Sequence, residues 1–127
     1  MAKSEKVMSP EDYMKNAVKT ESCDWPVIEL RMRGLARAMH GAIGMADEAG
    51  EVLSIIKKAV FYGKGLAHDE LRDAVKDEAG DVLWYMSILL SELDLTFEEV
   101  MEYNAEKLKS RYGGGAFDSK YVGGTDG

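Results

Sequence analysis

The stretch Asp77-Glu78-Ala79-Gly80-Asp81 decides the fold, because it places acidic residues inside an apolar helical pattern. Apolar residues recur around it in steps of three or four, which is typical of one face of a helix, at Leu71, Val75, Val82, Tyr85 and Leu89. Glu78 falls on this face, and Asp81 lies roughly 60° to its side. An ionised carboxylate on an apolar face is costly unless it is paired or bound to a metal. The stretch therefore predicts a helix with a functional acidic pair.

A second acidic pair lies upstream, in Asp47-Glu48-Ala49-Gly50-Glu51. Glu48 shares a helical face with four apolar residues, Met45, Val52, Ile55 and Ala59. Glu51 lies about one turn beyond Glu48. Asp47 and Asp77 point away from the two apolar faces, so we expect both in solvent. Two helices thus present four candidate site carboxylates, Glu48, Glu51, Glu78 and Asp81.

These four carboxylates are the kind of donor set that a hard divalent cation prefers. Mg²⁺ takes oxygen ligands, whereas zinc sites rely on thiolates and imidazoles, and no cysteine or histidine lies near the acidic pairs. Helix bundles build carboxylate metal sites from such i,i+3 pairs, and the di-iron versions carry His where Glu51 and Asp81 stand. We therefore predict that these four acids form a site for a divalent cation, with Mg²⁺ or Mn²⁺ favoured over iron.

The composition narrows the class of protein. The 127 residues carry a net charge of −7 and lack a basic patch, so we expect no nucleic-acid partner. A single cysteine fits a reducing compartment. No apolar run is long enough to span a membrane, and residues 1–7 lack a signal-peptide core. We therefore expect a cytoplasmic protein.

The periodicity predicts an all-α fold, a bundle of four to five helices. The expected helices cover residues 10–20, 26–40, 45–62, 69–93 and 97–112, with a break at Gly41–Gly44. Ser9, Asp69 and Thr96 are the expected N-caps, the last in a capping box with Glu99. We expect one domain over residues 1–112, followed by a glycine-rich tail over residues 113–127.

The last predicted helix supplies hydrogen-bond donors. Asn104, Lys107 and Arg111 lie on one face of it and could hold phosphate oxygens, Arg111 through its planar fork. For Lys107, an ordinary solvated position near a helix C-terminus is equally expected. Trp84 is a candidate for stacking on a nucleobase, although aromatic residues at helical spacing belong to the core more often.

The residues Gly44–Val52, Asp77–Tyr85 and Asn104–Tyr112 together resemble the all-α nucleotide pyrophosphohydrolases of the MazG type. The likeness extends over residues 35–112, and 26 residues separate Glu51 from Glu78. The resemblance implies Mg²⁺-dependent hydrolysis of a nucleoside triphosphate, often a deoxynucleotide, to the monophosphate and pyrophosphate. It also implies that the four acids are metal ligands and that Asn104, Lys107 and Arg111 steady the phosphates. Members of the family work as dimers or tetramers, with sites where helices of two subunits meet.

Several alternatives share this metal chemistry. A narrower dUTP or dCTP pyrophosphatase and a phosphoribosyl-ATP pyrophosphohydrolase differ only in their base and sugar contacts. A non-catalytic helical module that binds nucleotide or metal is the alternative from another class. The sequence leaves open the preferred base and sugar, the number of metal ions, dimer versus tetramer, the role of the tail, and a cellular or viral origin.

Overall fold

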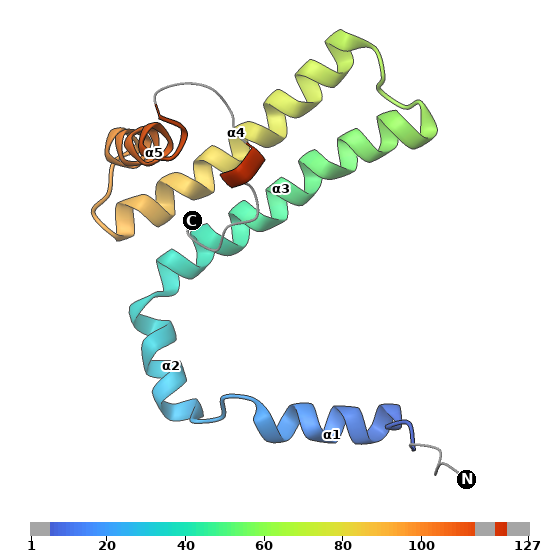
Figure 1. The fold of residues 1–127 in the computed structure, drawn as a ribbon, viewed down its shortest axis with the longest axis vertical. Helices are drawn as coiled ribbons and strands as arrows, with labels where there is room; N and C mark the ends of the chain where they lie inside the picture. Colours follow the sequence, from blue (N-terminus) through green and yellow to red (C-terminus); the bar gives the residue numbers. More distant parts are fainter. Residues whose placement is uncertain (1–5, 114–118, 122–127) are drawn as a thin grey trace. The chain divides into compact units, whose positions relative to one another are not determined.

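A computed structural model describes residues 6–113 and 119–121, and every regular element within them is helical (Figure 1). The predicted all-α class is therefore confirmed. The chain divides into two compact units, Met1–Leu35 and Ala36–Gly127. The extent of the domain, residues 1–112, stays a prediction.

The first unit contains two short helices, α1 (Pro10–Thr20) and α2 (Trp25–Gly34). The predicted cap of α1 is confirmed, because the Ser9 hydroxyl oxygen accepts a hydrogen bond from the Asp12 N–H at 3.1 Å. Within residues 6–35 every side chain is exposed except that of Ile28, which is half-buried. Helices this short are marginal in water without a packing partner.

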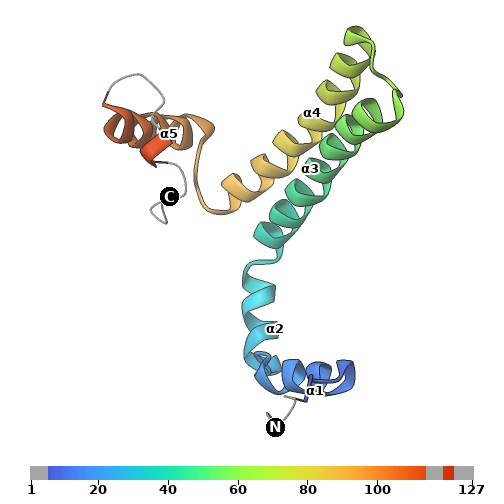
Figure 2. The same cartoon turned by 45° about the vertical axis from the view of Figure 1, so that its right-hand side comes forward.

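The second unit is built on a hairpin of two long helices, α3 (Ala36–Tyr62) and α4 (His68–Glu92). They run antiparallel and pack along their length (Figures 1 and 2). Gly63 and Gly65 form the turn with φ of 63° and 67°, a conformation that other residues rarely adopt. At the open end of the hairpin, Arg37 donates to the Glu92 carboxylate at 3.0 Å. The packing of α3 on α4 places the two acidic pairs on facing helices.

The predicted helix break at Gly41–Gly44 is wrong, because α3 continues through both glycines and the interruption lies at Leu35. Gly41 and Gly44 are buried against α4. A Cβ atom on Gly41 would come within 2.8 Å of the Leu89 backbone nitrogen. The glycines therefore permit a close approach of two helices.

The predicted N-cap at Asp69 is also wrong, because α4 begins one residue earlier and its N-cap is Ala67. Asp69 lies instead in the first turn of α4, together with Glu70. Acidic side chains suit that position because the helix dipole is positive there. Asp69 thus still supports the start of α4, but from a position two residues inside the cap.

The core of the hairpin is thin. Among the described residues, Ala59 and Leu90 are the buried hydrophobic side chains, with exposed fractions of 3% and 8%. The apolar positions predicted to face α3 are half-buried, namely Leu71, Val75, Val82, Tyr85 and Leu89. Leu53, Ile56 and Val60 form a second stripe on α3, here called the outer apolar face, and all three are exposed.

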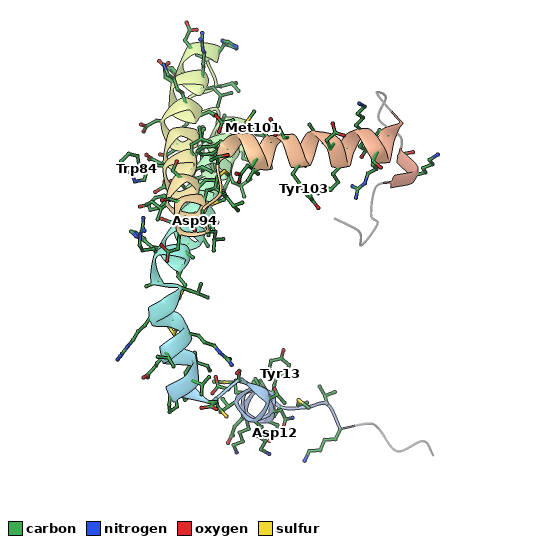
Figure 3. The ribbon with its side chains drawn as sticks, turned by 90° about the vertical axis from the view of Figure 1, so that its left-hand side faces the viewer. Asp12, Tyr13, Trp84, Asp94, Met101 and Tyr103 are labelled. Carbon is green, nitrogen blue, oxygen red and sulfur yellow. The ribbon has the colours of Figure 1, made fainter. Side chains whose placement is uncertain are left out.

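The last long helix, α5 (Phe97–Tyr112), begins with the predicted capping box. The Glu99 N–H donates to the Thr96 hydroxyl at 3.1 Å, and the Thr96 N–H donates to the Glu99 carboxylate at 3.4 Å. Figure 3 shows α5 running crosswise to the hairpin. A single 3₁₀ turn, Ser119–Tyr121, is the described part of the tail beyond Gly113.

Candidate metal centre

The hairpin brings three of the four predicted carboxylates together. Glu48 from α3 and Glu78 and Asp81 from α4 each offer a carboxylate oxygen, and these oxygens all lie within 4.8 Å of one another. We call these three residues the carboxylate group. Glu48 lies one turn after the buried Gly44, on the side of α3 that faces α4. The i,i+3 spacing puts Glu78 and Asp81 on adjacent turns of α4.

The carboxylate group is only partly shielded from solvent. Glu48 and Glu78 are half-buried and Asp81 is exposed. Glu78 occupies the predicted register against α3, but a single helix covers it, so it does not reach a fully buried core position. Among the described residues there is no buried charged side chain. The group is therefore open to ions and small molecules from the Asp81 side.

The electrostatics of the group favour an added positive charge. The pKa of Glu48 is raised by desolvation, then by a hydrogen bond with Glu78, and then by the negative charges of Asp81, Glu78 and Asp47. Each cause disfavours the ionised form of Glu48. A proton or a cation between the carboxylates relieves this repulsion.

The donor set fits a hard divalent cation. All three groups within reach are carboxylates, and none is a thiolate or an imidazole. The three carboxylates are carried by two packed helices rather than by loops, so their backbones are held in place. Oxygen donors on a rigid frame match the preference of Mg²⁺ and Mn²⁺.

Glu51, the fourth predicted ligand, is not part of the carboxylate group. It is exposed and lies three residues beyond Glu48 on α3, to the side of the face that meets α4. Its role as a metal ligand stays a prediction. The helical spacing puts both Glu51 and Asp81 at the flank of their apolar faces, and the packing of α3 on α4 brings Asp81 into the carboxylate group but not Glu51.

The predicted phosphate-binding residues lie on α5. Lys107 and Arg111 are half-buried and Asn104 is exposed. In the described part of the chain, α3 and α4 are the helices that pack extensively, and α5 has no comparable packing on either. The role of these three residues in binding phosphate stays a prediction.

Trp84, the predicted stacking residue, projects from α4 on the side away from α5 (Figure 3). Its exposed fraction is 69%, so it does not belong to the core of the hairpin. The side chain is therefore accessible to a planar ligand. Its role in base stacking also stays a prediction.

One relationship close to the carboxylate group was missed in the sequence. The Tyr85 ring lies against Gly44, and it also makes an edge-to-face contact with His40, with ring centroids 5.5 Å apart. Gly41, Gly44 and Glu48 follow one another in steps of three and four, which puts them on one face. This spacing indicates that the three residues face α4 together. The prediction of a helix break considered only the low helix propensity of the two glycines.

Comparison with known proteins identifies the family of this chain. Residues 42–114 match the MazG nucleotide pyrophosphohydrolase domain. The match covers more than half of the chain and contains every member of the carboxylate group.

The chain belongs to the MazG family.

The chain is also similar to a phage protein. The chain is 38% identical over 69 residues to the "Gene 37 protein" of Mycobacterium phage L5. The alignment covers 54% of this chain and 60% of that relative. No solved structure matches. None of the described helices is long and apolar enough to cross a lipid bilayer.

Proposed function

We propose that this MazG-family chain hydrolyses nucleoside triphosphates, including deoxynucleotides, to the monophosphate and pyrophosphate in a Mg²⁺-dependent reaction. One observation carries the proposal: Glu48, Glu78 and Asp81 converge from two helices until their oxygens lie within 4.8 Å. Such a concentration of negative charge has no evident structural benefit. It is accounted for by a cation that meets a polyphosphate.

Glu48, Glu78 and Asp81 would hold the Mg²⁺, with Mn²⁺ as a substitute, and Glu51 would join them from the next turn of α3. When bound, the metal neutralises phosphate charge and lowers the pKa of a coordinated water. The protein residues fix the position of that charge and leave one side of the group open. Because Asp81 is its exposed member, the phosphates would enter on the Asp81 side.

Lys107 and Arg111, together with Asn104, would hold the phosphate oxygens that the metal does not reach. An ammonium and a planar guanidinium suit this purpose, because both remain charged at neutral pH. These residues are carried by α5, which packs little on the hairpin of its own chain. We propose that α5 of one copy meets the hairpin of another copy, in a homodimer or homotetramer.

Two surfaces support this assembly. The outer apolar face exposes Leu53 and Val60 by 70% and 66%. On α5, Met101 is 67% exposed and Tyr103 is 74% exposed. The stripe on α3 is apolar along one face of the helix, and exposed apolar surface of this kind is typical of an interaction site. A second copy of the chain would cover it.

The remaining parts of the proposal concern the context of the reaction. Trp84, exposed on α4, would stack on the base of the nucleotide. The net charge of −7 fits a small phosphorylated substrate held through a metal, and no nucleic acid is expected as a partner. We propose that residues 1–112 form the catalytic domain and that the protein acts in the cytoplasm to control nucleotide pools.

The proposal is tested by product analysis. The pure protein is incubated with each common ribo- and deoxynucleoside triphosphate and Mg²⁺, and the products are separated by anion exchange. Monophosphate with pyrophosphate is the expected result, and it should vanish in excess EDTA. Diphosphate with orthophosphate would identify a different hydrolase. Turnover confined to dUTP, dCTP or phosphoribosyl-ATP would narrow the function, and no turnover at all would leave a binding module.

A further inference from the structure

We propose that Gly44 and Tyr85 are positioning residues that set the distance between α3 and α4 at the carboxylate group. The inference rests on the proposed function only in assuming that this group binds a divalent cation. It concerns how the fold brings the carboxylates together. It does not assign a new ligand.

The packing at Gly44 leaves no room for any side chain. A Cβ atom built on Gly44 would overlap the Cγ and Cδ1 atoms of the Tyr85 ring. One turn earlier, a Cβ atom on Gly41 would come within 2.8 Å of the Tyr85 carbonyl oxygen. Real Cβ atoms essentially never approach other atoms so closely. An alanine at Gly41 therefore requires the helix backbones to move apart, and an alanine at Gly44 requires the Tyr85 ring, and with it α4, to shift away from α3.

This close contact lies directly beside the carboxylate group. Gly44 precedes Glu48 by four residues on α3, and Tyr85 follows Asp81 by four residues on α4. Because the helices are antiparallel, the pair Gly44 and Tyr85 is offset from the carboxylates by about one helical turn, or about 5.4 Å. A change in helix separation at Gly44 should therefore also change the distance between the carboxylates of α3 and α4.

The Tyr85 ring is itself held in place. His40 lies one turn before Gly44, and its ring meets the Tyr85 ring edge to face at an interplanar angle of 65°. On the far side of the carboxylate group, Ala59 is buried with 3% of its surface exposed, so a small residue also lies between the helices there. Small residues thus keep α3 and α4 close on both sides of Glu48.

The chain offers a matched control for testing this role. Gly50 also lies within α3, but a Cβ atom built there meets nothing within 4 Å. Gly44→Ala and Gly50→Ala therefore make the same chemical change, and both gain helix propensity. They differ only in the space available for the added methyl group.

The experiment measures the affinity of the full-length protein for MnCl₂ alone, by titration calorimetry and by the Mn²⁺ electron paramagnetic resonance signal. We expect Gly44→Ala to weaken Mn²⁺ binding by about 10- to 100-fold, the range seen when groups that orient metal ligands are removed. Gly50→Ala should retain the affinity of the wild type. The double variant Gly44→Ala/Tyr85→Ala removes the overlapping ring and should bind Mn²⁺ more tightly than Gly44→Ala.

Two results would overturn the inference. One is a Gly44→Ala protein that binds Mn²⁺ as tightly as Gly50→Ala does. The other is a double variant that neither folds nor binds better than Gly44→Ala, because the ring would then not be the obstacle. Nucleotide turnover is measured separately. An inactive wild type with the expected order of Mn²⁺ affinities would refute the proposed hydrolysis and leave the positioning role intact.

Discussion

Glu48 on α3 and Glu78 on α4 present carboxylate oxygens within 4.8 Å of each other, with Asp81 equally close. Desolvation and a hydrogen bond with Glu78 raise the pKa of Glu48. A proton or a cation between the two carboxylates would relieve their mutual repulsion. The behaviour of the site can therefore be probed with metal and with acid before any substrate is known.

The first prediction concerns the charge of Glu78. Glu78→Gln keeps the shape of the side chain but removes a candidate ligand, so the affinity for Mg²⁺ should fall by more than about 100-fold, beyond the loss typical of a supporting group. Saturating Mg²⁺ at about 100 times its Kd stabilises a protein by about 2.7 kcal/mol. The melting temperature of the wild type should rise accordingly, and that of the variant should not.

Glu70→Gln is the control for this experiment, since Glu70 lies in the first turn of α4 and outside the carboxylate group. It should respond to Mg²⁺ as the wild type does. Without metal, Glu78→Gln should melt at the same temperature as the wild type or higher, because a repulsive charge is gone. A full Mg²⁺ response in Glu78→Gln would refute the metal assignment.

A second prediction concerns pH. The folded chain raises the pKa of Glu48 above its unfolded value, so the folded state binds this proton more tightly. The resulting stabilisation is fully present below the unfolded pKa and is lost as the pH rises through the folded pKa. Glu48→Gln imitates the protonated side chain at every pH.

In buffer with EDTA, Glu48→Gln should therefore melt at a higher temperature than the wild type at neutral pH. The difference should shrink as the pH is lowered toward the normal range of a glutamate. Circular dichroism melts of both proteins across this range give the comparison. Glu21→Gln, a change at an exposed carboxylate in the other unit, should show no such pH-dependent difference.

A third prediction separates two lysines on α5. Lys107→Gln should lower kcat/KM for the nucleotide by about 10- to 100-fold, because a hydrogen bond to a charged group contributes about 1.5–3 kcal/mol. Lys109 lies about 160° away around the same helix and is exposed. Lys109→Gln should leave the kinetics unchanged, and equal effects of the two changes would rule out a specific contact by Lys107.

A fourth prediction concerns the start of α5. Thr96→Ala removes the hydroxyl that accepts from the Glu99 N–H, and it should cost about 1 kcal/mol in the free energy of unfolding. Glu99→Gln retains a side chain able to complete the capping box, so it should cost much less. Urea denaturation of the three proteins measures both values. Similar losses in the two variants would indicate that the charge of Glu99 matters more than the cap.

The helix starts at Ser9 and Thr96 and the position of Glu78 could be predicted because each depends on local rules. Ser9 and Thr96 cap helices through neighbouring backbone groups, and Glu78 lies on the apolar face that the spacing predicted. Periodicity fixes which face of a helix a residue occupies, and two helices with acidic faces were enough to suggest the carboxylate group. Each of these inferences depends only on residues that are close together in the sequence.

The errors and omissions concern contacts between helices. Gly41 and Gly44 lower the local helix propensity, which predicted a break, but their burial against α4 outweighs that preference. The separation of Glu51 from the carboxylate group depends on how α3 is rotated toward α4, and no pattern within one helix reports that rotation. Likewise, the spacing on α5 identifies a cationic face but not the surface that it meets.

The hairpin of α3 and α4 also has a consequence for the order of events during synthesis. Its two helices are adjacent in the chain, so their pairing costs little loop-closure entropy, and contacts that are local in sequence form fast. We expect the carboxylate group to form once Glu92 has left the ribosomal exit tunnel, while α5 is still inside it. The nascent chain would then acquire its affinity for a divalent cation before Lys107 and Arg111, the residues proposed to hold phosphate, emerge from the ribosome.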